Sequence, residues 1–279
     1  MKYALVLQHP QLAQLDLSWL WAELDQTPHH LEDGVIRLTQ PQPFALSAEQ
    51  NQRLQALKIE VACLPDRPLS SIGLMVSDMD STLITIECID EIADQMGIKP
   101  QIAAITERAM QGELDFRASL IERVALLKGL PQSALADVYE RKLKLTPGAE
   151  TLIKTAKTHG IKFMLVSGGF TFFTDRLKER LGLDYAYANE LEIIDGVFTG
   201  KVIGDIIDAE AKARLLRQHR DELGLSPEQV IAMGDGANDI PMLEAAGIGV
   251  AFHAKEKTKN HATLAIDHYG LDQISRCFG

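Results

Sequence analysis

The sequence predicts an α/β protein in which a parallel sheet has helices on both faces, a helical segment inserted after its first strand, and a small α/β unit in front. Three observations support this prediction. From about residue 72 onward, short apolar runs alternate with helical stretches, a pattern typical of a covered parallel sheet. The long stretch between the first two runs has helical spacing. Residues 1–70 carry a strand signal and a helix signal of their own.

The first predicted unit ends near residue 70. Its apolar run over residues 3–7 predicts a strand, and Gln40-Pro41-Gln42-Pro43 marks a break in the chain. Ser47 and Gln50 have the spacing of a capping box, which predicts that a helix begins there. Nothing in this unit indicates catalysis, and we expect a small α/β module of a regulatory type.

The second predicted domain covers residues 71–279. Its apolar runs predict strands over residues 72–77, 162–166, 230–233 and 248–252. Asp195-Gly196, between two apolar stretches, predicts a hairpin. Ser226-Pro227 predicts a helix start, with Ser226 as N-cap and Pro227 in the first helical position.

The inserted segment spans about residues 85–145. It is rich in Ala, Leu, Glu, Lys and Arg, and its apolar residues have helical spacing, as in Leu120, Val124 and Leu127. No strand candidate stands out within it. Because it follows the first strand, we expect it to lie over the carboxyl edge of the sheet as a helical cap.

Composition and charge restrict the classes of function. The net charge of −11 argues against nucleic-acid binding, which needs a basic face, but local cations still allow a small anionic substrate. The three cysteines form no CxxC pair, which argues against a zinc knuckle or a disulfide framework and favours a reducing compartment. The first apolar run is too short for a signal peptide or a membrane span. We therefore expect a cytoplasmic protein with no membrane association, and a homodimer as its assembly.

Asp78 and Asp80 are the most informative pair in the chain. They follow the first strand of the predicted sheet, one residue apart. If the chain turns just after the strand, both side chains face the crevice in which open α/β sheets bind ligands. Because burying two unpaired acids is costly, a cation or a reaction is the natural explanation.

Other polar groups follow further strands at the same predicted edge. Ser167-Gly168-Gly169 offers a hydroxyl and backbone N–H groups for anionic oxygens. Asp235 and Asp239 offer the hard oxygen ligands that Mg²⁺ prefers. Lys212 offers a positive charge for a transferring group, although a single helical lysine is more often exposed to solvent. Together these groups suit phosphoryl transfer.

The ordered motifs resemble the haloacid dehalogenase superfamily. Asp-x-Asp-x-Thr, Ser-Gly-Gly, Lys and Gly-Asp-Gly-x-Asn-Asp occur in the order of that family, and the match covers about residues 72–253. The resemblance implies a Rossmann-like core and an aspartyl-phosphate mechanism. It also implies site roles: Asp78 as nucleophile, Asp80 as acid and base, Mg²⁺ on the carboxylates of Asp78 and Asp235 and the backbone carbonyl of Asp80, and phosphate contacts from Ser167, Gly168, Lys212 and Asn238.

The inserted segment resembles the cap of the phosphoserine phosphatase family. The resemblance implies that Glu87 binds the ammonium group of O-phosphoserine, that Arg123 binds its carboxylate, and that Met110 and Phe116 form the apolar wall of the pocket. An acid and a guanidinium also match an amino-acid group chemically, since arginine binds carboxylates in a bidentate manner. The implied reaction is hydrolysis of O-phosphoserine to serine and phosphate, the last step of serine biosynthesis.

Alternatives remain open at this point. The protein would also fit a phosphatase or phosphotransferase of the same superfamily that acts on another small phosphate ester. An amino-acid-sensing regulatory protein with an idle α/β domain is a different class, although the intact set of acids and Lys212 argues against an idle domain. Asp239 either coordinates the metal through water or holds Lys212 in place.

Overall fold

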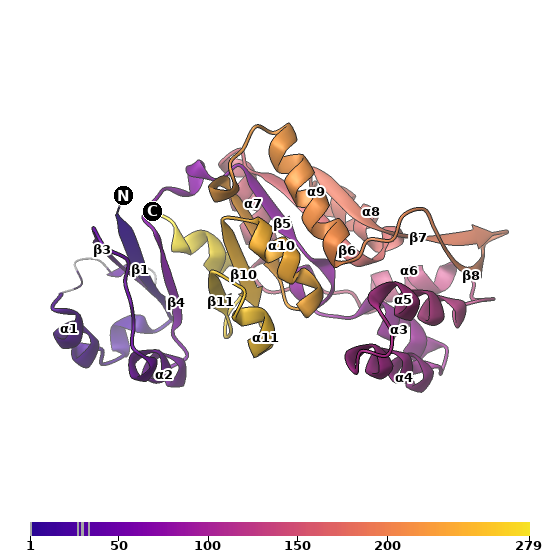
Figure 1. The fold of residues 1–279 in the computed structure, drawn as a ribbon, viewed down its shortest axis with the longest axis horizontal. Helices are drawn as coiled ribbons and strands as arrows, with labels where there is room; N and C mark the ends of the chain where they lie inside the picture. Colours follow the sequence, from indigo (N-terminus) through magenta and orange to yellow (C-terminus); the bar gives the residue numbers. More distant parts are fainter. Residues whose placement is uncertain (1, 27, 29–30, 33) are drawn as a thin grey trace.

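The computed structural model of the chain describes residues 2–26, 28, 31–32 and 34–279, and these residues form two sheets. Figure 1 shows a smaller sheet at the N-terminal end, a larger sheet in the middle, and a group of helices at the opposite end from the smaller sheet. The smaller sheet has four strands and the larger sheet has seven. The predicted fold class, an α/β protein with an added helical cap and a small N-terminal α/β unit, is confirmed.

The N-terminal sheet is antiparallel, in the order β2-β3-β1-β4. Its elements are β1 (Tyr3–Gln8), α1 (Ser18–Leu24), β2 (Leu31–Glu32), β3 (Val35–Gln40), α2 (Ala48–Ala56) and β4 (Glu60–Pro65). The predicted capping box is present, because the Gln50 N–H donates to Ser47 Oγ and the Ser47 N–H donates to Gln50 Oε1. This unit has a hydrophobic core of its own, which includes Leu5, Leu20 and Leu54. The domain boundary near residue 70 stays a prediction.

The larger sheet has the order β11-β10-β9-β5-β6-β7-β8, and its strands are parallel except for β8. Its strands are β5 (Leu74–Ser77), β6 (Lys162–Phe170), β7 (Tyr185–Ile194), β8 (Val197–Ile203), β9 (Val230–Gly234), β10 (Ile248–Phe252) and β11 (Leu264–Ile266). The helices that follow or connect them are α7 (Ala149–Thr158), α8 (Thr171–Leu181), α9 (Ala209–Glu222), α10 (Ile240–Ala245) and α11 (Glu256–Lys259).

Both faces of this sheet are buried, as the continuous apolar strands predict. Leu74 and Val76 of β5 belong to one core cluster, which also contains Leu216 of α9. Met75, between them, belongs to another cluster, which contains Leu152 of α7. Successive side chains of a strand point to opposite faces, so the two clusters lie on the two sides of the sheet.

The cap contains four helices, which lie between β5 and β6 in the sequence. A hairpin that extends from the sheet packs against these helices. The helices are α3 (Cys88–Gln95), α4 (Lys99–Met110), α5 (Phe116–Ala125) and α6 (Ser133–Arg141). The predicted hairpin is formed by β7 and β8, and both residues of its turn have positive φ (51° at Asp195 and 75° at Gly196). The Gly129 N–H donates to Phe198 O at 2.9 Å, so the hairpin continues out of the sheet and packs against the cap (Figure 1).

Two local expectations differ from the structure. Ser226 and Pro227 open only a single 3-10 turn, Pro227–Gln229, because the chain enters β9 at Val230. Ser167-Gly168-Gly169 lies inside β6, within an interruption of its pairing with β7, whereas the sequence predicted that it follows the strand. Strand β11 has no counterpart among the predicted strands.

The two sheets are joined by a buried carboxylate. Glu60 of β4 accepts hydrogen bonds from the backbone N–H groups of Asp267, His268 and Tyr269 at 3.0, 2.6 and 3.1 Å. These residues follow β11, so the bonds fix the N-terminal unit against the edge of the larger sheet. Several charge-assisted bonds to one carboxylate give a contact that is stronger than neutral hydrogen bonds.

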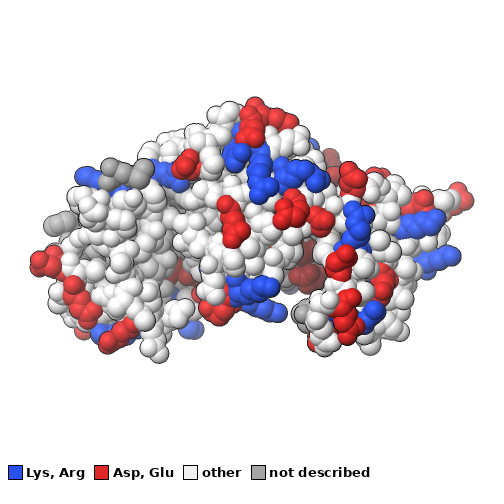
Figure 2. All heavy atoms as spheres, in the orientation of Figure 1, with Lys and Arg blue, Asp and Glu red and all other residues white. Residues whose placement is uncertain are grey.

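On the face shown in Figure 2, Lys and Arg side chains lie among Asp and Glu side chains. Among the described residues, none of the helices combines the length and the apolarity that crossing a membrane requires.

Candidate active site

Three neighbouring strands bring the predicted motifs to one edge of the sheet. Strand β5 lies between β9 and β6, and the three are parallel, so their carboxyl ends meet. Asp78 follows β5, Ser167 lies near the end of β6, and Asp235 follows β9. A cleft of about 410 Å³ opens here between the sheet and the cap. Of the predicted site residues, the cleft is lined by Asp78, Asp80, Glu87, Arg123, Ser167, Gly168, Asp235 and Asn238.

The turn after β5 places both aspartates of the first motif at the cleft. The Asp78 N–H donates to Met233 O at 2.9 Å, which extends the pairing with β9 by one residue. Residues 79–83 then form one irregular helical turn, in which Ser81 has a φ of +54°. Because the chain leaves the extended conformation in this turn, Asp78 and Asp80 both line the cleft instead of alternating across a strand.

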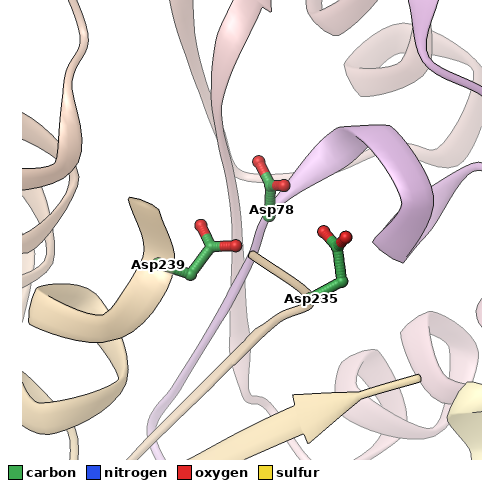
Figure 3. A group of neighbouring side chains, drawn as sticks. All are labelled: Asp78, Asp235 and Asp239. Carbon is green, nitrogen blue, oxygen red and sulfur yellow. The ribbon is translucent and has the colours of Figure 1, made fainter. Parts of the chain in front are cut away.

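Three carboxylates form a group that could hold a metal ion. Oxygens of Asp78, Asp235 and Asp239 all lie within 4.8 Å of one another. Figure 3 shows the three side chains next to one another, with Asp78 on the segment after β5 and with Asp235 and Asp239 on the segment after β9. Clustered carboxylate oxygens suit a hard divalent cation such as Mg²⁺. The Asp80 side chain is not part of this group, and the predicted role of its backbone carbonyl stays a prediction.

The pKa shifts indicate that Lys212 does not fully offset the negative charge of the acid group. Burial, followed by the charge of Asp239, raises the pKa of Asp235 to about 6. Burial and the same charge raise the pKa of Asp78, although Lys212 opposes this. A divalent cation among these oxygens would favour their ionised forms. The donor set therefore fits a metal ion.

Lys212 is buried beneath this group and contacts two of its acids. Its Nζ donates to Asp78 Oδ1 at 2.6 Å and to Asp239 Oδ1 at 2.8 Å, and only 1% of the residue is exposed. Burial alone would lower the pKa of Lys212, but the charges of Asp239 and Asp78 outweigh it and raise the pKa. Lys212 thus remains a cation inside the protein. Of the two roles left open for Asp239, the structure contains the contact with Lys212.

The position of Lys212 follows from the start of α9. Asp208 is the N-cap of this helix, and its Oδ1 accepts a hydrogen bond from the Ala211 N–H at 2.9 Å. A capped start fixes the first turn of a helix. Lys212 is in the next position, so the cap holds its stem against the end of the sheet.

The side chain of Asp80 lies at the start of α3, near Glu87. Its Oδ1 accepts a hydrogen bond from the Cys88 N–H at 3.0 Å, at the start of α3. Burial, followed by the nearby charge of Glu87, raises the pKa of Asp80 to about 7. A carboxyl group with a pKa near neutrality can both donate and accept a proton at working pH.

The cap contributes an acid and a base to the same cleft. Glu87 precedes α3, and its Oε1 accepts a hydrogen bond from Ser81 Oγ at 2.6 Å. Arg123 lies near the end of α5, and its Nε donates to Ser119 O at 3.3 Å. Burial lowers the pKa of Arg123, while the charges of Asp90 and Glu87 oppose this. The cleft can therefore offer opposite charges to a ligand with both an ammonium and a carboxylate group.

Gly168, the first glycine of the second motif, allows Phe116 of the cap to approach the backbone of β6 closely. A Cβ atom added at Gly168 would lie 2.8 Å from Cζ of Phe116, closer than a side chain tolerates. Phe116 lines the cleft, where the sequence predicted an apolar wall. The side chain of Met110, predicted for the same wall, lies outside the described part of the structure.

Sequence reasoning assigned no role to three polar side chains at or near the site. Thr82 Oγ1 donates to Asp235 Oδ1 at 3.3 Å, and Ser81 holds Glu87 as described above. Both lie inside the first motif, so their place beside Asp80 was a usable signal. Asn189, on β7, contacts the second motif, and nothing in its local sequence marks it.

Comparison with known proteins agrees with this geometry. A family model for haloacid dehalogenase-like hydrolases matches residues 75–244. The chain belongs to the haloacid dehalogenase-like hydrolase family. The predicted family and enzyme class are thereby confirmed. All residues that line the cleft lie within the matched range.

Similar members of the family are phosphoserine phosphatases. One from Polaromonas sp. is 52% identical over 215 residues, which cover 75% of this chain and 91% of that protein. The crystal structure of a probable phosphoserine phosphatase from Vibrio cholerae matches with a TM-score of 0.83 and 39% identity, covering 99% of this chain and 85% of that one. A hydrolase of the family from Salmonella enterica serovar Typhi matches with a TM-score of 0.85 and 34% identity, covering 98% and 97%.

Proposed function

We propose that the protein is a phosphoserine phosphatase, which hydrolyses O-phospho-L-serine to L-serine and phosphate in serine biosynthesis. One observation carries the proposal: a single cleft combines the acids of a phosphoryl-transfer site with Glu87 and Arg123 on the cap. O-phosphoserine has a phosphate, an ammonium and a carboxylate group. Glu87 and Arg123 offer charges opposite to the ammonium and the carboxylate, and the acid group would hold a cation for the phosphate. The similarity to proteins named phosphoserine phosphatases supports the same substrate.

We propose Mg²⁺ as the cofactor, held by the carboxylates of Asp78 and Asp235 and the backbone carbonyl of Asp80. When bound, the ion would neutralise charge on the phosphate and on the nucleophile. Asp239 belongs to the same acid group, and its bond to Lys212 gives it a supporting role. The donor set of hard oxygens supports this choice of metal.

In the proposed reaction, Asp78 attacks phosphorus and becomes the covalent aspartyl-phosphate. Asp80, in its protonated form, gives its proton to the departing serine oxygen. It then removes a proton from the water molecule that hydrolyses the intermediate. The pKa of about 7 supports this double role, because both protonation states of Asp80 are accessible near neutrality.

Lys212, Ser167 and the N–H of Gly168 would hold the phosphate oxygens that carry charge during transfer. Asn238 also lines the cleft, and in the sequence it lies between Asp235 and Asp239. It would support the substrate and the metal ligands. On the cap, Glu87 would bind the substrate ammonium and Arg123 its carboxylate.

Replacing Arg123 with alanine tests the substrate directly. We expect KM for phosphoserine to rise by roughly 10- to 100-fold, since a charged hydrogen-bonded pair in a buried cleft contributes about 1.5–3 kcal/mol. KM for p-nitrophenyl phosphate, which has no carboxylate, should change by less than about threefold. Steady-state kinetics on both substrates measures the difference.

Arg108→Ala is the matched control for this experiment. Arg108 is also on the cap, but it is exposed and forms ion pairs with Glu113 and Glu122 at the surface. It should leave both KM values unchanged. An equal rise of KM for the two substrates in Arg123→Ala would instead favour a phosphatase for another small phosphate ester.

We further propose a cytoplasmic enzyme that forms a homodimer, with a regulatory role for the N-terminal unit. The bonds between Glu60 and the backbone of residues 267–269 support a mechanical link between that unit and the catalytic domain. The complete set of catalytic acids argues against a protein that only senses an amino acid.

A further inference from the structure

The second motif lies in a bulge of β6. Val166 pairs with Tyr187 of β7, and the next pair is Phe170 with Asn189. Three residues of β6, Ser167 to Gly169, thus lie opposite the single residue Ala188. A bulge leaves its extra residues without ladder partners, and their buried backbone groups need other hydrogen bonds.

The side chain of Asn189 supplies one of these bonds and forms a second bond with another segment. Its Nδ2 donates to Gly168 O at 2.8 Å, and its Oδ1 accepts from the Ile207 N–H at 2.8 Å. The residue is completely buried. A buried amide with both ends paired has one fixed orientation, because turning it over would place donor against donor and acceptor against acceptor.

The bond to Gly168 O also fixes the hydroxyl of Ser167. The peptide unit between Gly168 and Gly169 is planar, so its C=O and N–H point in opposite directions. With the C=O directed at Asn189, the Gly169 N–H points away and donates to Ser167 Oγ at 2.8 Å. A hydroxyl that accepts this bond keeps its own proton available for an oxygen in the cleft.

The bond from Ile207 connects the same amide to Lys212. Ile207 immediately precedes Asp208, the N-cap of α9, and Lys212 lies in the first turns of that helix. One buried side chain therefore contacts both segments that carry phosphate-facing groups, the bulge of β6 and the start of α9.

We infer that Asn189 is a positioning residue for the phosphate-binding half of the cleft. It holds Ser167, Gly168 and the start of α9 in the arrangement that receives the phosphoryl group, without touching the substrate itself. The inference rests on the proposed phosphoserine phosphatase function and concerns only the phosphate end of the substrate.

The test compares two variants in the full-length protein. Asn189→Asp keeps the size and the acceptor for Ile207 but places an oxygen against Gly168 O. Asn189→Leu keeps the number and branching of the side-chain heavy atoms, removes both bonds and adds no charge. Inhibition of p-nitrophenyl phosphate hydrolysis, in the presence of Mg²⁺, gives separate inhibition constants for inorganic phosphate and for L-serine.

We expect the inhibition constant for phosphate to rise about tenfold or more in both variants. A buried polar group that is left unpaired costs a free energy equivalent to about a tenfold change in a binding constant. The constant for serine, which uses Glu87 and Arg123, should change by less than about twofold. The agreement of the two variants would exclude the new charge of Asn189→Asp as the cause. KM for phosphoserine should rise with the phosphate constant.

Gln50→Leu is the matched control. Gln50 is a buried amide with both ends bonded, to Glu23 and to the backbone of Ser47, but it lies in the N-terminal unit. It should lose stability without changing either inhibition constant. Unchanged constants in both Asn189 variants, or equal changes for phosphate and serine, would overturn the inference. If the unaltered protein does not hydrolyse phosphoserine, the proposed function is rejected. The inhibition constants for inorganic phosphate, measured with p-nitrophenyl phosphate, would still decide the role of Asn189.

Discussion

Asp78→Asn is expected to abolish turnover and leave the fold intact. The amide cannot form an aspartyl-phosphate, and removal of a covalent nucleophile lowers turnover by roughly 10⁴-fold or more. The substitution is nearly isosteric. The amide oxygen of the variant can still accept the hydrogen bond that Lys212 donates to Asp78 Oδ1 in the native protein. The buried ammonium group of Lys212 therefore keeps a hydrogen-bond acceptor at position 78.

Phosphate release from phosphoserine measures this loss, and circular dichroism with thermal unfolding checks the fold. Asp184→Asn is the matched control, because Asp184 also pairs with a lysine, Lys162, and accepts a backbone N–H, but lies outside the cleft. The control should retain full activity. Substantial phosphate release by Asp78→Asn would exclude Asp78 as the covalent nucleophile.

Lys212→Met should cost both activity and stability. The variant leaves the carboxylates of Asp78 and Asp239 buried without the cation that contacts them at 2.6 and 2.8 Å. Breaking a buried ion pair on one side typically costs about 3 kcal/mol or more. Loss of a cation at the transferring phosphoryl group should lower turnover by about 10²-fold or more as well.

Urea unfolding in the presence of EDTA measures the stability change without a bound metal ion. The deficit should be larger at pH 8 than at pH 5, because burial raises the pKa of Asp78 and protonation then removes the charge of its unpaired carboxylate. Lys259→Met serves as control, since Lys259 also contacts two acids, Asp267 and Glu256, but is partly exposed. Its loss should cost less than about 1 kcal/mol. Equal losses in the two variants would show that burial of the Lys212 contacts contributes nothing.

The sequence was informative where a signal is local. The strand before Asp78, the hairpin turn at Asp195-Gly196 and the capping box at Ser47 each depend on residues close together in the chain, and the structure contains all three. Parallel strands with polar ends also predicted that Asp78 and Asp235 would meet, because such ends share one edge of a sheet.

Other features depend on contacts between distant segments, and the sequence had no pattern for them. The attachment of the β7–β8 hairpin to the cap needs the bond between Gly129 and Phe198. Strand β11 has only three residues and is defined by its pairing with β10. The bulge at Gly168 and its contact with Asn189 arise from the register of two strands, which apolar periodicity does not specify.

The helix predicted to start at Ser226 does begin there, with Ser226 as N-cap, but it is only a single 3-10 turn. Ser226 and Gln229 do form a capping box, so the local signal is real. The helix fails to extend because Val230 begins a completely buried strand, and burial in the sheet outweighs the local preference. Tertiary packing thus decided the length of this element.

The central claim is tested most directly by phosphate release from a panel of phosphate esters, with Mg²⁺ and with EDTA. The panel contains O-phospho-L-serine, O-phosphothreonine, a sugar phosphate and p-nitrophenyl phosphate. We predict that kcat/KM is highest for phosphoserine, by about tenfold or more over the esters without an amino-acid group, and that activity is lost in EDTA and restored by Mg²⁺. A higher kcat/KM for a sugar phosphate, or full activity in EDTA, would contradict the account.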